Sequence, residues 1–134
     1  MESDCIFCAI GAGRIPSFKI YEDDISLAYL DINPMSFGHT LVIPKIHSAG
    51  LLDTPDEMLC KLMMRVKKIA SHIKDTLPCD GFNILQNNGE AAGQTVGHIH
   101  FHIIPRVNGA GVTFEGAKGD MELLKALAAR LRMS

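Results

Sequence analysis

The sequence predicts an α+β protein in which several short strands surround one long helix. Three observations lead to this fold class: short apolar runs bounded by turn-forming residues, one long amphipathic helix pattern near the middle of the chain, and a second helix pattern near the C-terminus. The 134 residues match the commonest size of one domain. We therefore expect a single domain over residues 1–134, with a core at about 4–106 and a C-terminal tail and helix over 107–134.

The N-terminal part of the chain predicts one helical turn and three strands. Residues 5–11 suit a helical turn that ends at a glycine-containing break. Residues 19–22 and 26–30 flank the turn-forming pair Asp23-Asp24 and predict a hairpin. Residues 39–43 predict a further strand that ends at Pro44.

The long helix is predicted over residues 55–77. Thr54 and Glu57 have the spacing of a capping box, and Pro55 lies where a first-turn proline is tolerated. Pro78 ends the pattern. The apolar residues recur at intervals of three and four and predict a core-facing stripe, formed by Met58, Leu59, Leu62, Met63, Val66, Ile69, Ala70, Ile73 and Leu77.

The C-terminal half predicts two more strands and a last helix. Residues 81–86 and 99–104 read as strands, and a glycine-containing loop over residues 87–95 connects them. A glycine-rich stretch follows Pro105, and residues 120–132 predict a helix.

Composition excludes several classes of protein. The net charge is −2, and no stripe of Lys and Arg indicates a nucleic-acid partner. No apolar run is as long as the roughly 18 residues of a membrane-spanning helix. The first four residues are acidic rather than basic and apolar, so we expect no secretory signal and a cytoplasmic protein. Its four cysteines are then expected to be thiols or metal ligands.

The most informative segment is the histidine cluster at residues 98–104. Side chains alternate across a strand, so His98, His100 and His102 are expected on one face and the apolar residues between them on the other. Packing in a hydrophobic core does not explain three histidines at alternate positions of one strand. They suit a metal site, because neutral imidazole is a common ligand, or nucleophilic and acid–base chemistry, because imidazole titrates near neutral pH. The pattern alone leaves both interpretations open.

The loop before the histidines favours a phosphate ligand. Gly89 and Gly93 offer backbone N–H groups with little steric hindrance, and Gln94 and Thr95 add two neutral donors. Such a loop can surround an anion without a formal positive charge.

The segment from Gly93 to Arg106 resembles the signature of the histidine triad family, in which three histidines alternate with apolar residues. Further matches occur upstream in the family's order, at residues 5–8, 30–34 and 38–45, followed by His47. The resemblance covers about residues 4–106 and is closest to small bacterial and protozoal members and to the purine nucleoside phosphoramidase branch. It implies an antiparallel five-stranded sheet with one long helix and short N- and C-terminal helices.

The resemblance also implies a nucleotide hydrolase or transferase. His100 matches the histidine that attacks the α-phosphorus and forms a covalent nucleotidyl intermediate. We expect a backbone carbonyl to hold its Nδ1 proton and leave Nε2 free to attack. No catalytic metal is required. The catalytic positions implied are His100, His102, His39, Gln94 and Thr95. The positions implied to bind an AMP- or GMP-type purine nucleotide are Ile6, Phe7, Asp31, Ile32, Asn87, Gly93, Gln94, Thr95, His100 and His102.

A structural zinc site is a further expectation. Cys5 and Cys8 have the C-x₂-C spacing of one half of a tetrahedral site, and two packed thiols are the alternative. The resemblance implies that His47 and His98 complete the site. His98 would then hold zinc while His100 performs chemistry.

Three other functions stay open at this point. One is hydrolysis of dinucleoside polyphosphates within the same family. Another is a nucleotide-binding or scaffold protein without turnover. The third is a metal enzyme that uses all three histidines as ligands. The resemblance further implies a homodimer formed through the long helix and the strand beside it.

Overall fold

The computed structural model describes residues 4–133. Residues 1–3 lie outside the described part. The expectation that the chain has no secretory signal concerns these first residues. The elements, in chain order, are α1 (Ile6–Gly11), β1 (Lys19–Glu22), β2 (Ser26–Leu30), β3 (Thr40–Pro44), η2 (Leu51–Asp53), α2 (Asp56–Thr76), β4 (Gly81–Leu85), η3 (Glu90–Ala92), β5 (Phe101–Arg106) and α3 (Met121–Leu131).

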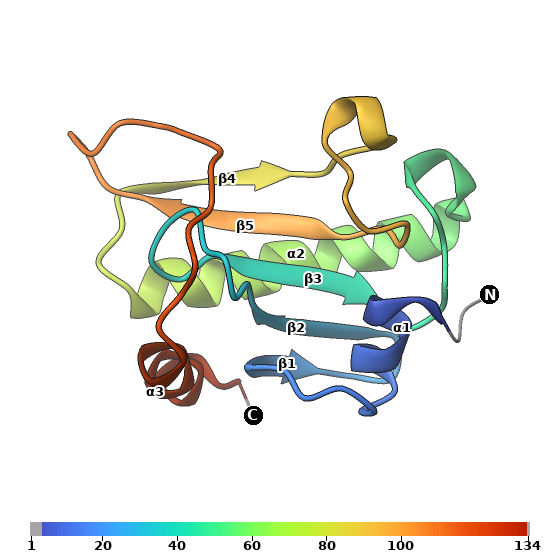
Figure 1. Cartoon of the computed structure of the whole chain (residues 1–134), viewed down its shortest axis with the longest axis horizontal. Helices are drawn as coiled ribbons and strands as arrows, with labels where there is room; N and C mark the ends of the chain where they lie inside the picture. Colours follow the sequence, from blue (N-terminus) through green and yellow to red (C-terminus); the bar gives the residue numbers. More distant parts are fainter. Residues whose placement is uncertain (1–3, 134) are drawn as a thin grey trace.

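The strands form one antiparallel sheet in the order β1-β2-β3-β5-β4 (Figure 1). The predicted α+β class, the hairpin of β1 and β2, and the five strands are confirmed. Every residue of β2 and β3 is buried. These two central strands are covered on both faces, which explains why their sequences are apolar throughout rather than alternating.

The long helix α2 lies across one face of the sheet (Figure 1). Leu62, Val66, Ile69 and Ile73 of α2 pack against residues of β2, β3 and β5 in the main core. The apolar stripe is therefore confirmed for these residues, but Met63 is 42% exposed and lies outside the core.

The predicted capping box at the start of α2 is wrong. Pro55 occupies the N-cap position and makes no side-chain capping bond. The hydroxyl of Thr54 donates instead to the carbonyl of Gly50 at 2.8 Å and lies 2.7 Å from the Ser48 hydroxyl. Thr54 thus holds the loop before the helix, because its buried hydroxyl finds its partners in Gly50 and Ser48 of that loop.

The second face of the sheet carries a smaller apolar cluster beneath α1. Phe7 packs there with Leu27, Tyr29, Leu41 and Ile43. Cys5 caps α1, since its sulfur accepts from the Cys8 amide at 3.4 Å. The short helix is therefore held against the sheet by Phe7 and begins at a cysteine of the predicted metal site.

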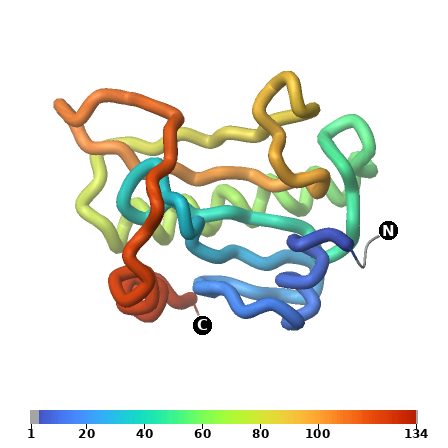
Figure 2. The backbone as a smooth tube through the Cα atoms, in the orientation of Figure 1, coloured from blue at the N-terminus to red at the C-terminus, as the bar shows by residue number. Residues whose placement is uncertain are grey.

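The C-terminal segment passes from the end of β5 across the second face to α3 (Figure 2). The Asp120 carboxylate caps α3 by accepting from the amides of Glu122 and Leu123. Leu124, Leu127 and Leu131 of α3 join the main core. The predicted helix over 120–132 is confirmed apart from its end residues.

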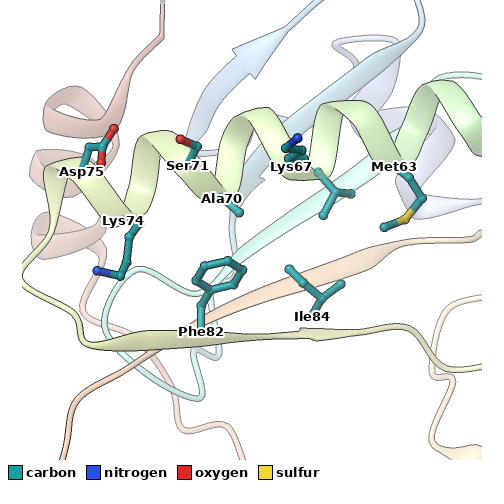
Figure 3. Close-up of a pocket in the computed structure, with 9 residues that line it drawn as sticks. Met63, Lys67, Ala70, Ser71, Lys74, Asp75, Phe82 and Ile84 are labelled. Atoms are coloured by element: carbon teal, nitrogen blue, oxygen red, sulfur yellow. The ribbon is translucent and has the colours of Figure 1, made fainter.

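One apolar surface of the sheet and helix stays uncovered. It lies between α2 and the edge strand β4, where Phe82 and Ile84 stand on β4 and face Met63 and Ala70 of α2 around a hollow of about 430 Å³ (Figure 3). Phe82 and Ile84 are 42% and 40% exposed. No helix among residues 4–133 is long and apolar enough to cross a membrane.

Asp23 links the β1–β2 turn to α2. Its carboxylate accepts from the Ser26 amide and hydroxyl, the Ile25 amide, the Tyr21 hydroxyl and the Arg65 guanidinium, at 2.8–3.0 Å. Burial alone would raise the pKa of Asp23, but these donors, with Arg65 foremost, outweigh it and hold the pKa well below its ordinary value.

We expect Asp23→Asn to lower the free energy of unfolding at pH 7 by about 1–3 kcal/mol, because it removes charge-assisted hydrogen bonds. A folded-state pKa below the unfolded one stabilises the protein above pH ~4, and this stability is lost as the pH falls further. The difference between wild type and variant should therefore shrink as the pH falls from about 4 to about 2, measured by urea unfolding. The matched control is the exposed neighbour Asp24, whose change to Asn should have little effect. A difference that is constant with pH would contradict this account.

Candidate active site and metal site

The three clustered histidines lie around the start of β5. The predicted strand over 99–104 begins later than expected, at Phe101, so only His102 belongs to a strand. The reason is that the Ile99 amide donates to the carbonyl of Ser48 at 2.7 Å, outside the sheet. The alternation itself is retained. Ile99, Phe101 and Ile103 enter the main core, and His98, His100 and His102 are buried on the opposite side.

His100 is held by its own chain. Its Nδ1 donates to the backbone carbonyl of His98 at 2.8 Å, so the proton of the neutral ring lies on Nδ1 and Nε2 keeps its lone pair. The edge-to-face contact with Phe7 fixes the plane of the ring, with centroids 4.9 Å apart. Burial lowers the pKa of His100, against the opposing effects of the His98 carbonyl and of Asp31. This hydrogen bond is the one expected from the sequence.

His102 carries its proton on the opposite nitrogen. The amide of Met35 donates to Nδ1 of His39 at 3.0 Å, so the neutral His39 ring is protonated at Nε2. That Nε2 lies 2.9 Å from Nδ1 of His102 and donates to it. The remaining proton of the neutral His102 ring must therefore lie on Nε2.

Both rings of this pair stay neutral at cellular pH. Burial, followed by the positive charges that His100 and His39 would carry, lowers the pKa of His102 to about 3. Burial also lowers the pKa of His39, although Asp31 acts in the other direction. The rings of His100 and His102 are 5.0 Å apart. The lone pair on Nε2 of His100 and the proton on Nε2 of His102 thus lie on neighbouring rings.

Gly38 is required for the position of His39. It has a φ of +91°, and a Cβ atom there would lie 2.5 Å from Cδ1 of Leu77 and 3.3 Å from Pro105. The glycine before His39 therefore provides both the backbone conformation and the space for this turn.

A cavity of about 540 Å³ opens beside His100 and His102. Its walls include the predicted residues Ile6, Phe7, Asp31, Ile32 and Thr95. Asp31 accepts from the amide of Asn33 at 2.8 Å and is partly exposed, so a carboxylate oxygen is available to a ligand.

Sequence reasoning missed other residues of the cavity. Ile15 and Phe18 precede β1, and Met121 opens α3. Met121 is more than ten residues beyond the matching motifs and gave no signal in the sequence. Because such residues belong to no motif, only the three-dimensional structure shows that they line the cavity.

Four predicted residues lie outside the cavity walls: His39, Asn87, Gly93 and Gln94. The Gln94 amide nitrogen donates to the carbonyls of Ala49 and Val96, and its oxygen accepts from the Gly89 amide, at 2.7–2.9 Å. Both amide protons are thus used within the protein. Gln94 holds the loop that carries Thr95 to the cavity.

Cys5, Cys8, His47 and His98 come together from three separate segments, and their ligand atoms all lie within 4.8 Å of one another. Nδ1 of His98 is 3.4 Å from the Cys5 sulfur, and Nδ1 of His47 is 3.3 Å from the Cys8 sulfur. A tetrahedral zinc site with Zn–S of about 2.3 Å and Zn–N of about 2.0 Å requires sulfur–nitrogen separations of about 3.5 Å. The arrangement fits that geometry.

The protonation of His98 also fits a metal ligand. Its Nε2 donates to the Pro44 carbonyl at 2.9 Å, which leaves the Nδ1 lone pair directed at the sulfurs. Burial lowers the pKa of His98 and favours the neutral ring. None of the four cysteines, all of which lie in the described part of the chain, forms a disulfide.

A second group, Asp31, His39 and His102, is also compact but suits a metal poorly. His39 accepts at Nδ1, so a metal at Nε2 would have to displace the only proton of the ring. The short contact to His102 is explained by the hydrogen bond.

We expect long-range ¹H–¹⁵N NMR spectra at pH 7 to show His100 protonated at Nδ1 and His102 protonated at Nε2. His102 should remain neutral on acidification well below the ordinary histidine pKa of about 6.5, since its pKa is lowered to about 3. The same tautomer for both rings, or a titration of His102 near 6.5, would contradict the proton arrangement derived above.

Comparison with known proteins places this chain in a family. Residues 12–109 match the HIT domain. The chain is 40% identical over 138 aligned residues to a Candida albicans protein named adenosine 5′-monophosphoramidase, with 98% of this chain and 91% of the relative covered.

Two crystal structures are similar to this fold. One is a HIT-like protein of Bartonella henselae (TM-score 0.91, 42% identity, 97% of this chain and 95% of that chain covered). The other is a zinc-bound histidine triad protein of Mycobacterium smegmatis (TM-score 0.82, 43% identity, 98% and 97% covered). The chain, with its paired His100 and His102 beside an apolar cavity, therefore belongs to the histidine triad (HIT) family.

Proposed function

We propose that the protein hydrolyses purine nucleoside 5′-phosphoramidates, or related nucleotidyl substrates, at the α-phosphorus through a covalent intermediate on His100. The observation that carries the proposal is the pair of opposite tautomers, which presents a bare Nε2 on His100 beside an Nε2–H on His102. The name of the Candida albicans relative supports the substrate class.

The cavity has the size and composition of a nucleotide site. Its volume of about 540 Å³ lies within the range of small-molecule pockets, about 300–1,000 Å³. Ile6, Phe7 and Ile32 offer apolar surfaces for an AMP- or GMP-type base. The Asp31 carboxylate can accept from the two ribose hydroxyls, and the phosphate then lies at His100 and His102.

The reaction proceeds in two displacements. Nε2 of His100 attacks the α-phosphorus, the phosphorus–nitrogen bond to the leaving amine breaks, and the amine takes up a proton from solvent. Water then attacks the same phosphorus, loses a proton to solvent, breaks the bond between phosphorus and Nε2 and releases the nucleoside monophosphate. In both steps the Nε2–H of His102 donates a hydrogen bond to a phosphate oxygen without being transferred, and the Thr95 hydroxyl is a second donor.

The loop before the triad acts on the phosphate through its backbone conformation rather than through a formal charge. Gln94 fixes the loop through the Ala49 and Val96 carbonyls, while Gly93, in left-handed conformation at φ +93°, packs near Asn87. We propose that these three residues act on the phosphate through the backbone of the loop and through the position of Thr95. His39 acts in turn by holding the proton of His102 in place.

The Cys5, Cys8, His47 and His98 cluster is proposed to bind a structural zinc ion, and the zinc-bound Mycobacterium smegmatis relative supports this assignment. Four protein ligands would leave no open coordination position. The bound ion would join α1 to the segment that carries His100, and such ions contribute on the order of 10 kcal/mol to folding.

A homodimer is proposed at the apolar surface between α2 and β4. β4 is an edge strand with β5 as its neighbour, and Phe82 and Ile84 are half-exposed beside Met63 of α2 (Figure 3). Pairing this edge with a second copy would extend the sheet and cover these side chains.

We expect wild type to release AMP from an adenosine 5′-phosphoramidate and His100→Ala to lose at least about 1,000-fold in kcat, as for the loss of a nucleophile elsewhere. The control is His72→Ala, because His72 bonds to the Leu131 carbonyl and neither residue lines the cavity, so kcat should stay within about twofold. Wild type that binds AMP without turnover would favour a nucleotide sensor or scaffold. Turnover of diadenosine polyphosphates instead would favour the alternative function, hydrolysis of dinucleoside polyphosphates.

Metal content separates structural zinc from a metal held by all three triad histidines. We expect Cys8→Ala and His47→Ala to be purified without zinc and to unfold at lower temperature, and His100→Ala to retain about one zinc per chain. The matched cysteine control is Cys60→Ala, since Cys60 is exposed on α2. Loss of the metal in His100→Ala would contradict the division of roles within the triad.

Phe82→Glu is expected to separate the dimer, because a charge would then lie in the apolar contact. Light scattering at micromolar concentration should give twice the chain mass of 14.6 kDa for wild type and one chain mass for the variant. Leu52→Glu, at a 96% exposed position of η2, is the control and should remain dimeric. A monomeric wild type would refute the proposed dimer.

A further inference from the structure

The C-terminal segment before α3 lies against the loop that carries Asp31 and Ile32 (Figure 2). The Gly119 amide donates to the Ile32 carbonyl at 2.8 Å, and the Ala117 amide donates to the Pro34 carbonyl at 3.3 Å. Asp31 and Ile32 form part of the cavity wall. The segment therefore bonds to the backbone of the loop that faces the cavity.

The contact is too close for any side chain at two positions of the segment. A Cβ atom on Gly116 would lie 2.1 Å from the Asn33 carbonyl oxygen. On Gly119 it would lie 2.9 Å from the Ile32 carbonyl oxygen. Both obstacles are backbone atoms of the loop, so an added methyl group has to displace the loop or the segment.

Besides this segment, His39 anchors the loop, because its carbonyl accepts from the Asp31 amide and its Nδ1 accepts from the Met35 amide, both at 3.0 Å. Ile32 is 47% exposed, so burial of its side chain holds the loop only in part. The Asn33 amide is used within the loop, where it donates to the Asp31 carboxylate. The same C-terminal segment also leads directly to Met121, which lines the cavity from α3.

We propose that residues 116–121 position the nucleoside end of the substrate, with Gly116 and Gly119 as positioning residues and Met121 as a contact on the cavity wall. This inference rests on the proposed function. Gly116 and Gly119 meet the carbonyls of Asn33 and Ile32 rather than the Met35 amide that holds His39, so they act on the part of the loop at the ribose and base. Disturbance of the segment therefore weakens substrate binding and leaves the chemical step largely unchanged.

The test compares Gly116→Ala and Gly119→Ala with the exposed neighbours Glu115→Ala and Lys118→Ala. With an adenosine 5′-phosphoramidate, the glycine variants should raise KM by about tenfold, which corresponds to a loss of about 1.4 kcal/mol of binding free energy. Their kcat should stay within about twofold, and the two controls should match wild type. An unchanged KM, or an equal loss of kcat with lower thermal stability, would overturn the proposal.

A double-mutant cycle with Asp31→Asn tests the route of the effect. If Gly116 acts through the Asp31 loop, the KM effect of Gly116→Ala should be much smaller in the Asp31→Asn background than in wild type. Fully additive effects would show that Gly116 does not act through this carboxylate and would contradict the proposed route.

Hydrogen exchange provides a readout that is independent of turnover. The amides of Ala117 and Gly119 should exchange faster in Gly116→Ala, and exchange in the peptide over residues 31–36 should also rise, relative to Glu115→Ala. Unchanged protection would overturn the inference even if wild type is active. An inactive wild type with the expected exchange pattern would refute the proposed function alone, because the positioning of the loop would still be observed.

Discussion

The hydrogen bond from the Met35 amide to Nδ1 of His39 determines the proton positions of His39 and His102. It leaves His39 with its proton on Nε2, which then donates to His102 and leaves His102 with an outward N–H. The His98 carbonyl imposes the opposite arrangement on His100. Both results require uncharged rings, and the burial that lowers the pKa values of His39, His100 and His102 supplies that condition. The proton positions that the proposed reaction requires thus originate in backbone groups that take no part in the reaction themselves.

His98 joins the two parts of the site. Its Nε2 bonds to the end of β3, its Nδ1 faces the cysteines of α1, and its carbonyl holds His100. Phe7 of α1 contacts the rings of both His98 and His100. A metal ion in the cluster of cysteines and histidines would therefore influence the nucleophile by fixing the helix and the carbonyl beside it, without any contact with the substrate.

The sequence could predict those features that depend on local patterns. The alternation of residues 98–103 and the apolar stripe of α2 are periodic signals, the hairpin around Asp23 follows from a turn-forming pair, and the structure contains each of them. Predictions were wrong where a distant partner decides the outcome. Thr54 bonds to the preceding loop rather than capping α2, and Ile99 bonds to Ser48 and delays the start of β5. Met63 lies beside the edge strand, which no helical periodicity can indicate. The contact of Gly116 with Asn33 joins segments more than eighty residues apart and was equally inaccessible.

The central claim is that Nε2 of His100 becomes bonded to phosphorus, and intact-protein mass spectrometry tests it most directly. Wild type is mixed with a reactive adenosine phosphoramidate and quenched in acid-free conditions within milliseconds. We expect a mass increase of one adenylyl group per chain, located at His100 by peptide mapping and absent from His100→Ala. Turnover without any adduct under conditions where the first step is fast, or an adduct on another residue, would contradict the account.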